Sequence, residues 1–304
     1  MKILVTGGAG FIASHVVDRY VEMGHEVLVV DDLSTGTKGN VNERAALHQL
    51  DVGSSAFVEL VREERPDVIN HHAAQTSVRI SVDDPLNDCR RNVLASLNLI
   101  DAAKRAHVGK VIYISSGGAI YGEPVSLPCA EDNPIRPDSP YGASKHAPEH
   151  YLDIYQRVHG LNYTVLRYGN VYGPRQDPFG EAGVIAIFTA RMLAGESTTI
   201  YGTGEQERDF VYVGDVVEAN VAALDKGDSE AFNIGAGMGT TVNEIFRLLK
   251  DATGYGREAE YAPAKPGETF RIFLDITKSA NGLGWRPKTE LQAGLAATVA
   301  SLRE

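Results

Sequence analysis

The stretch KILVTGGAGFIASH at the start of the chain constrains the fold more than any other feature of the sequence. Its apolar residues 2–6 have the length of a buried strand, and Gly7, Gly10 and Ala13 follow at the spacing of a dinucleotide-binding fingerprint. Glycines at such a turn let the backbone approach a pyrophosphate, which then lies at the N-terminus of the following helix. The chain is therefore expected to open with a dinucleotide-binding strand, turn and helix.

An acidic residue about 20 positions after the glycines supports this interpretation. Asp31 ends the second apolar run, within VVDDLSTG, and Asp32 follows it. A carboxylate at this place hydrogen-bonds the ribose hydroxyls of NAD and repels the 2′-phosphate of NADP. The sequence thus favours NAD over NADP as the cofactor, with Asp31 as the main determinant.

Apolar runs of strand length alternate with helical patterns through the first half of the chain. The strand-like runs are residues 2–6, 26–30, 66–74, 110–116 and 163–168, and the helical patterns are residues 11–23, 54–65, 85–106 and 141–159. Strands separated by helices of this length pair in parallel. We therefore predict an α/β fold with a doubly wound parallel (Rossmann) sheet.

The sequence changes character in its second half, where glycine and proline recur and the apolar runs are short. We expect residues 1–166 to form the NAD-binding Rossmann domain and residues 167–304 to form a smaller domain that binds the substrate and completes a cleft. A strand-like run at 231–235 indicates that part of 210–235 rejoins the first domain.

Charge and composition exclude several kinds of partner. The net charge of −11 argues against a nucleic-acid or anionic-membrane surface, because both require basic patches. No apolar stretch approaches the ~18 residues of a membrane span, and the N-terminal run is too short and too broken by glycine for a signal peptide. Cys89 and Cys129 stand at no metal-ligand spacing, so we expect reduced thiols, no metal and a cytoplasmic location.

The stretch SPYGASK holds the strongest catalytic candidates. Tyr141 and Lys145 stand at positions i and i+4, so they share one face of a helix. A phenol ionises near pH ~10, and an ammonium held close favours the phenolate and brings it within reach of proton transfer. Taken alone, an accidental surface pair is the simpler explanation. Pro148 lies in the same helix, and we expect it to bend the helix at Ser144–Pro148, one turn past this pair.

The full set of motifs resembles the extended short-chain dehydrogenases/reductases, and most closely the UDP-galactose (UDP-glucose) 4-epimerase family. The shared stretches, in order along nearly the whole chain, are TGGAGFIASH, DDLSTG, HHAAQTSV, SSGGAIYG, SPYGASK, LRYGNVYGPRQDP and GTGEQERDFVYVGDV. The resemblance implies a redox-neutral, NAD-dependent isomerase that inverts C4 of a UDP-hexose, UDP-glucose or UDP-galactose, through a 4-keto intermediate.

The resemblance also implies roles for individual residues. Ser116 would bond the 4-oxygen of the sugar, Tyr141 would be the acid/base, and Lys145 would hold the nicotinamide ribose and lower the tyrosine pKa. The cofactor would be bound by Gly7, Gly10, Phe11, Ile12, Asp31, Asp32, Ser34, Thr35, Gly36, Asp51, Val52, Ala73, Ala74, Gln75, Asn92, Tyr141, Lys145 and Tyr168. The UDP-sugar would be bound by Ser116, Tyr141, Asn170, Val184, Thr199, Ile200, Tyr201, Arg208, Lys265, Glu268 and Ile272.

Three further expectations concern the substrate side and the assembly. Arg208 would hold the diphosphate, because a planar guanidinium suits two phosphate oxygens, unless it pairs with a neighbouring carboxylate instead. Ile272 would border the sugar and favour UDP-hexoses over their N-acetyl forms. The helices at 92–106 and 141–159 carry apolar positions beyond the needs of one sheet, and the resemblance implies a homodimer formed through them.

Three other functions fit parts of the sequence. Nucleotide-sugar 4,6-dehydratases share the fold, but they carry an acidic pair where this chain has Gly117 and Gly118. A uronate-specific relative, such as a UDP-glucuronate 4-epimerase, needs a cation for the sugar carboxylate, which Arg175 or Arg271 could supply. A non-catalytic dinucleotide sensor would have no need of the serine, the tyrosine and the lysine together.

Overall fold

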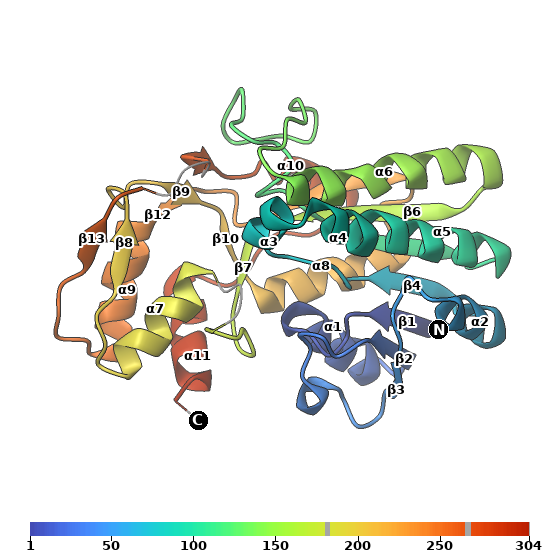
Figure 1. Ribbon diagram of the computed structural model, residues 1–304, viewed down its shortest axis with the longest axis horizontal. Coiled ribbons are helices and arrows are strands. Elements are labelled where there is room, and N and C mark those ends of the chain that lie inside the picture. Colours follow the sequence, from blue (N-terminus) through green and yellow to red (C-terminus); the bar gives the residue numbers. More distant parts are fainter. Residues whose placement is uncertain (180–182, 265–268, 304) are drawn as a thin grey trace.

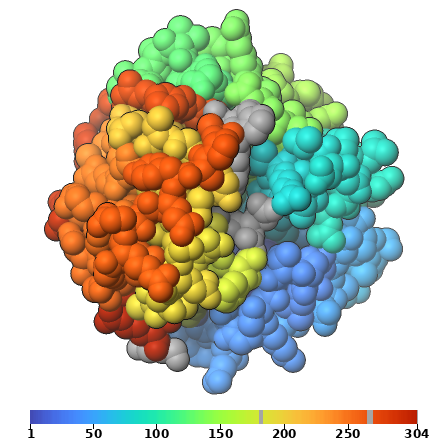
Figure 2. Space-filling model, turned by 60° about the vertical axis from the view of Figure 1, so that its left-hand side comes forward, coloured from blue at the N-terminus to red at the C-terminus, as the bar shows by residue number. Residues whose placement is uncertain are grey.

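The computed structural model describes residues 1–179, 183–264 and 269–303, and its elements fall into two regions (Figure 1). One region is a parallel sheet with helices on both faces, and the other combines short strands and helices from the C-terminal half. Figure 2 shows the yellow and orange C-terminal segments on one side of a furrow and the blue and cyan N-terminal segments on the other. Within the described residues, no helix is long and apolar enough to cross a membrane.

The sheet has seven parallel strands in the order β11–β6–β5–β4–β1–β2–β3. Their bounds are β1 (Lys2–Thr6), β2 (Glu26–Asp31), β3 (Ala46–Gln49), β4 (Val68–His71), β5 (Lys110–Ser116), β6 (Asn162–Tyr168) and β11 (Glu230–Ile234). The order runs outward from β1 in one direction and from β4 in the other, which is the arrangement of a doubly wound sheet. The predicted fold class is confirmed.

Helices cover both faces of this sheet (Figure 1). One face packs against α1 (Phe11–Glu22) and α8 (Val213–Asp225), and the other packs against α2 (Ser55–Glu64), α5 (Ala95–Arg105) and α6 (Pro140–His159). Val5 belongs to the first buried cluster and its neighbour Leu4 to the second. This alternation follows from the two-residue period of a strand, and it explains why the three central residues of β1, Ile3 to Val5, are all apolar.

Two segments of the first region differ from the predicted elements. The single helix expected at 85–106 is α4 (Pro85–Cys89), a π-helical turn η2 (Arg90–Leu94) and α5 in succession, and α3 (Val78–Asp83) precedes them. Strand β3 was not predicted. It lies at the edge of the sheet with no buried residue, so it carries no apolar run to reveal it.

The second region pairs short strands across long sequence distances. The pairs are β8 (Thr199–Tyr201) with β13 (Glu260–Ala262), β9 (Glu207–Arg208) with both β12 (Thr240–Thr241) and β14 (Arg271–Ile272), and β10 (Phe210–Tyr212) with β7 (Asn170–Tyr172). The helices α7 (Val184–Leu193), α9 (Val242–Thr253) and α11 (Leu291–Ser301) enclose an apolar cluster of their own. This region therefore has a core separate from those of the sheet.

The chain also returns to the sheet region late in the sequence. Strand β11 pairs in parallel with β6, and its Ile234 lies opposite Tyr168. Beyond it, α10 (Thr277–Gly282) leads to Trp285, the single tryptophan, which is buried in the same cluster as α1 and α8. The Trp285 indole N–H donates to the Asp215 carbonyl at 2.8 Å. The core of the sheet region thus depends on residues far beyond position 166.

Candidate active site

Two glycines shape the turn between β1 and α1. Gly7 has a φ of +70°, and a Cβ at this position would lie 2.8 Å from the backbone nitrogen of Ala73, which follows β4. Helix α1 begins at Phe11 after Gly10, and no side chain caps its first N–H groups. The turn therefore brings two strand ends together and leaves amide donors for a pyrophosphate.

Asp31 ends β2 beside this turn. Its carboxylate is 7% exposed and accepts backbone N–H bonds from Ala9 at 3.0 Å and Leu33 at 2.9 Å. Burial raises the pKa of Asp31, and the two backbone bonds oppose that rise. A carboxylate accepts about four hydrogen bonds, so two positions are left for ribose hydroxyls. The turn and this carboxylate together fit the pyrophosphate and the ribose of NAD.

A cation that the sequence did not reveal lies beside Asp32 and Ser34, in the loop after β2. Arg91, on the π-helical turn, approaches the Asp32 carboxylate at 3.7 Å and donates to the Ser34 hydroxyl at 3.2 Å. Ser34 in turn donates to Asp32 at 2.6 Å. Arg91 is 57 residues from Ser34, so no local motif connects them. The predicted ribose site therefore has a positive side chain at its border as well as two acids.

On the other side of the predicted cofactor site, the side-chain amides of Asn92 and Gln75 form hydrogen bonds that connect the loop after β4 to its surroundings. The Asn92 side chain accepts from the Gln75 N–H at 2.8 Å, and donates to the Gln75 carbonyl at 2.9 Å and to the Ser144 hydroxyl at 3.0 Å. The Gln75 amide donates to Asp88 at 2.8 Å. These side chains bind the loop after β4 to α6, so their predicted contribution to cofactor binding would come from positioning that loop.

The remaining cofactor candidates differ in exposure. Tyr168 lies in the core beneath α1 and α8, where its hydroxyl accepts from Asn220 at 2.6 Å. Val52 is buried in the cluster on the opposite face. Thr35 and Asp51 are exposed, and Ile12, Gly36, Ala73 and Ala74 are half-buried. Tyr168 and Val52 would thus support a cofactor site through packing.

Tyr141 and Ser116 meet where α6 approaches the end of β5. Helix α6 begins after Ser139, whose hydroxyl accepts from the Gly142 N–H at 3.2 Å and caps the helix. Desolvation raises the pKa of Tyr141 to about 12, and a hydrogen bond with the Ser116 side chain works in the opposite direction. Burial outweighs this hydrogen bond, and the predicted lowering of the Tyr141 pKa by Lys145 stays a prediction.

Lys145 lies on the same face of α6 and is almost fully buried. Its ammonium lies 4.7 Å from the centre of the Tyr113 ring. Burial lowers the pKa of Lys145 to about 8, and the charges of Glu149 and Asp88 oppose this shift. The lysine charge is therefore stabilised by carboxylates of α4 and α6 and by an aromatic ring, and it is easily lost above neutral pH.

Pro148 does not end the helix, which continues from Pro140 to His159. Proline removes the N–H that would bond to the Ser144 carbonyl. The next carbonyl, that of Lys145, accepts from the Tyr113 hydroxyl at 3.0 Å and from the Ser115 hydroxyl at 3.4 Å. Side chains of β5 thus support the helix backbone at the proline, and the bend at this turn stays a prediction.

A buried ion pair lies under the catalytic helix. Glu149 and Arg167 are 8% and 6% exposed, and Arg167 Nη2 lies 2.6 Å from the Glu149 carboxylate. The Ser115 hydroxyl also donates to Glu149 at 2.6 Å, and Arg167 Nη1 donates to the Tyr121 hydroxyl at 2.8 Å. Burial raises the pKa of Glu149, but the His146 side chain, the charge and hydrogen bonds of Arg167 and the Ser115 hydroxyl together lower it to about 2. No sequence motif indicated this pair, since its members are separated by a helix and a turn.

On the substrate side, Arg208 and Asn170 occupy neighbouring short strands. Arg208 Nη1 donates to the carbonyls of Glu207 at 2.9 Å and Phe270 at 3.3 Å, and the Asn170 N–H donates to the Asp209 carbonyl at 2.6 Å. The Glu207 carboxylate pairs with Arg271 at 2.8 Å. Backbone groups therefore orient the Arg208 guanidinium, as a phosphate-binding arginine requires.

The other substrate candidates lie at different depths. Thr199, Ile200 and Tyr201 form β8, with Ile200 buried and Tyr201 exposed. Val184 is half-buried at the start of α7. Ile272 is 2% exposed and packs with Ile120, Tyr121, Cys129 and Leu274. Lys265 and Glu268 lie outside the described residues.

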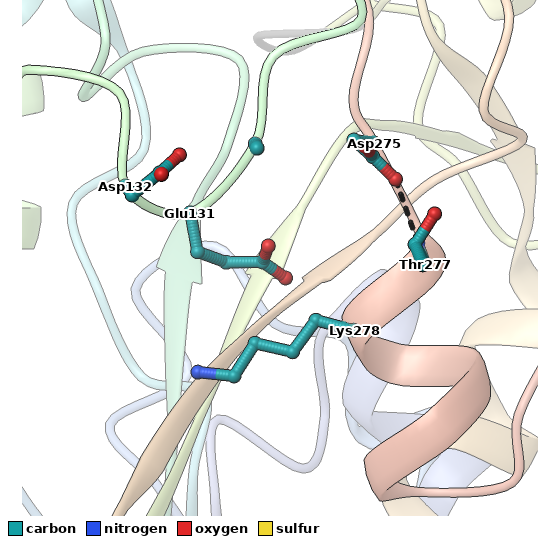
Figure 3. Close-up of a pocket in the computed structure, with 6 residues that line it drawn as sticks. Glu131, Asp132, Asp275, Thr277 and Lys278 are labelled. Atoms are coloured by element: carbon teal, nitrogen blue, oxygen red, sulfur yellow. Dashed lines mark hydrogen bonds between the residues drawn. The ribbon is translucent and has the colours of Figure 1, made fainter.

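A cavity of about 460 Å³ lies apart from these candidates, at the start of α10 (Figure 3). It is lined by Ala130, Glu131, Asp132, Asp275, Thr277 and Lys278. The Glu131 and Lys278 side chains point toward one another across it. Lys278 pairs with Glu230 at 2.7 Å, and none of the lining residues was a predicted site residue.

Comparison with known proteins agrees with this geometry. The model of the NAD dependent epimerase/dehydratase family matches residues 3–235. The chain belongs to this family. A curated relative, the UDP-glucose 4-epimerase of Mycolicibacterium smegmatis, is 43% identical over 309 residues, covering 100% of this chain and 99% of the relative.

Two solved structures of the family are also similar to this chain. The UDP-glucose 4-epimerase of Thermotoga maritima with UDP-glucose has a TM-score of 0.98 and 51% identity, covering 100% of this chain and 99% of that one. The UDP-glucose 4-epimerase of Thermus thermophilus in complex with NAD has a TM-score of 0.95 and 45% identity, with the same coverage. The resemblance seen in the motifs is confirmed by these matches.

Within this family, the geometry bears on the alternative functions. A Cβ at Gly117 would lie 2.7 Å from the Leu274 side chain, so the acidic pair of a dehydratase would not fit there without rearrangement. Arg175 lies 2.8 Å from Asp18, and Arg271 is paired with Glu207. Both cations named for a uronate carboxylate thus have acidic partners already, which weakens the uronate alternative.

Proposed function

We propose that the chain catalyses NAD-dependent, redox-neutral epimerisation at C4 of a UDP-hexose, interconverting UDP-glucose and UDP-galactose. The observation that carries the proposal is the contact of Ser116 with Tyr141 beside Lys145, at the edge where β1 and β2 also end. Parallel strands present their carboxyl ends at one edge, so the fingerprint, Asp31 and these three side chains share it. The similarity to UDP-glucose 4-epimerases over the full chain supports the substrate class.

The chain's own residues would supply the proton chemistry. Tyr141 would take the proton from the 4-hydroxyl and return it after inversion, and the Ser116 hydroxyl would donate a hydrogen bond to the 4-oxygen. Bound NAD would supply the hydride acceptor and donor for C4, and the turn from Gly7 to Phe11 and Asp31 would hold it. Because burial holds the Tyr141 pKa at about 12, the ammonium of Lys145 is needed close by to stabilise the phenolate.

The two regions would hold different parts of the ligands. The turn between Gly7 and Phe11 would bind the pyrophosphate of NAD and Asp31 its ribose. Arg208 and Asn170 would bind the diphosphate of the substrate and leave the hexose free to turn over. A Cβ at Gly118 would lie 3.5 Å from the Asn170 amide oxygen, an ordinary van der Waals contact, so the end of β5 lies close to the substrate side.

We further propose a homodimer in the cytoplasm. Leu86 and Leu94 are 68% and 55% exposed, and Tyr151, Ile154 and Val158 give α6 an apolar outer face. An exposed apolar surface on two adjacent helices is typical of a four-helix interface. A monomeric mass in solution at micromolar concentration would contradict the dimer. The two cysteines are free thiols, which suits a reducing compartment.

The function is tested by incubating the purified protein with UDP-glucose, UDP-galactose, their N-acetyl forms and UDP-glucuronate, without added NAD. We expect UDP-glucose and UDP-galactose to interconvert without net NADH, because the hydride returns to the sugar it left. NADH formed in proportion to product would show a dehydrogenase. Conversion of UDP-glucuronate alone would favour the uronate alternative.

A further inference from the structure

A buried carboxylate that the proposed mechanism does not use lies where the two regions meet. Asp209 stands between β9 and β10 and is 2% exposed. Its carboxylate accepts backbone N–H bonds from Ala236 at 2.5 Å, Gly237 at 3.2 Å and Leu274 at 3.0 Å. Burial raises the pKa of Asp209 to about 6, and these three bonds oppose the rise. The charge is therefore held by backbone amides.

The same residue is joined to both substrate candidates. The Asp209 carbonyl accepts the Asn170 N–H at 2.6 Å. Arg208 precedes Asp209 and pairs with Thr240 of β12 on one side and Ile272 of β14 on the other. A displacement of Asp209 would therefore move the backbone of Arg208 and of Asn170 together.

The carboxylate also fixes the strands that flank Arg208. Ala236 and Gly237 lie between β11 and β12, and Leu274 follows β14 by two residues. One side chain thus connects the sheet region, through the end of β11, with both neighbours of β9. A Cβ at Gly235 would lie 2.4 Å from Asp209 Oδ2, so the loop reaches the carboxylate only because this position is glycine.

We propose that Asp209 is a positioning residue for substrate binding, whose buried carboxylate fixes Arg208 and Asn170 in the geometry that binds the uridine diphosphate. This inference rests on the proposed function. Ser116, Tyr141 and Lys145 lie on β5 and α6, whereas the Asp209 carboxylate bonds to Ala236, Gly237 and Leu274. Loss of the carboxylate should therefore weaken nucleotide affinity and leave turnover at saturating substrate nearly unchanged.

Asp215 provides a matched control for the test. It is also a buried carboxylate, and it accepts backbone N–H bonds from Lys288 at 3.0 Å and Thr289 at 3.0 Å. Its partners belong to the segment before α11 rather than to the strands around Arg208. Asp215→Asn therefore removes the same kind of bond without disturbing the substrate candidates.

The experiment compares Asp209→Asn and Asp215→Asn with the wild type. Calorimetric titration with UDP measures affinity, and initial rates with UDP-galactose separate KM from kcat. We expect Asp209→Asn to raise the Kd for UDP and the KM about tenfold, the worth of one charge-assisted hydrogen bond, with kcat within about threefold of wild type. Asp215→Asn should lower the thermal midpoint and leave the Kd within about twofold.

A second variant covers the case in which Asp209→Asn does not fold. In Gly235→Ala the added methyl group would displace the Asp209 carboxylate, so this variant should also raise the Kd for UDP. Wild-type affinity in a folded Asp209→Asn or Gly235→Ala protein would overturn the inference, as would equal weakening in Asp215→Asn. Failure of the wild type to bind UDP would instead reject the proposed function.

Discussion

The sheet region and the C-terminal region place their candidate residues by different means. In the sheet region, Asp31 and Ser116 stand at the ends of long parallel strands, and Tyr141 stands on the first turn of a helix. In the C-terminal region, Arg208 and Asn170 stand on strands of two and three residues, whose partners are far away in sequence. In the proposed function, chemistry would therefore depend on local elements, and substrate binding would depend on the assembly of distant segments.

The largest expected effect tests the chemical side of this comparison. Tyr141→Phe should lower kcat by about 10²–10⁴, the usual worth of general acid–base catalysis, because the phenol is the proposed acid/base. UDP binding should be nearly unchanged, since the residues proposed to bind the diphosphate, Arg208 and Asn170, lie in the second region. The measurement is turnover of UDP-galactose beside calorimetry with UDP. Tyr155→Phe, on the same helix, serves as the control, and a Tyr141→Phe enzyme as fast as wild type would refute the assignment.

Cofactor selectivity should change by a smaller factor. Asp31→Ser should weaken NAD binding and admit NADP, because the repulsion of the 2′-phosphate is reduced and Arg91 stands nearby to attract it. We expect the affinity for NAD to fall roughly ten- to a hundredfold, because a hydrogen bond to a charged group contributes ~1.5–3 kcal/mol. Fluorescence titration with both cofactors measures the change. If Asp31→Ser with Arg91→Ala binds NADP as well as Asp31→Ser alone, Arg91 has no part in it.

The pH dependence of activity should show whether Glu149, in its buried pair with Arg167, affects Lys145. Lys145 has a pKa of about 8, and the Glu149 charge raises it, so Glu149→Gln should lower it. Activity requires the ammonium and is lost as pH rises through this pKa, hence the alkaline limb of kcat/KM should move to lower pH in the variant. Asp153→Asn, on the exposed side of α6, is the control. An unmoved limb would show that Glu149 does not act on Lys145.

The smallest expected effect concerns sugar preference. Ile272→Ser should raise the rate on UDP-N-acetylglucosamine relative to UDP-glucose severalfold, if the side chain borders the sugar. Because Ile272 is buried among Ile120 and Leu274, the same change should also cost stability, about 2–5 kcal/mol for a large-to-small core substitution. Rates and thermal midpoints are measured together. Lower stability with an unchanged rate ratio would make Ile272 only a core residue of the cluster that it forms with Ile120 and Leu274.

The sequence was most informative where a local element positions a residue. The strand, the glycine turn and Asp31 could be predicted because they are close together in the sequence. Each of these features also has a known physical role in binding a dinucleotide. The same is true of Tyr141 and Lys145, which share a helix face. Edge strand β3 was missed, because it has no buried residue and shows no apolar alternation.

Features that depend on distant contacts could not be predicted. Arg91 reaches Ser34 across 57 residues, and the Asp209 carboxylate reaches Leu274 across 65. Burial raises the pKa of Tyr141 to about 12, and this desolvation depends on packing that a motif does not describe, while the effect of Lys145 on that pKa stays a prediction. Sequence motifs thus identified the chemical groups but not the environment that sets their properties.

The position of Trp285 has a consequence for biosynthesis. Its side chain completes the cluster formed by α1, α8 and the first strands, and β11 adds the last strand of the sheet from residues 230–234. Chains emerge from the ribosome N-terminus first, at about 5–20 residues per second. The nucleotide-binding sheet therefore cannot close its core until nearly the whole chain has been made. A nascent chain stalled before residue 230 would expose that apolar face to chaperones and proteases.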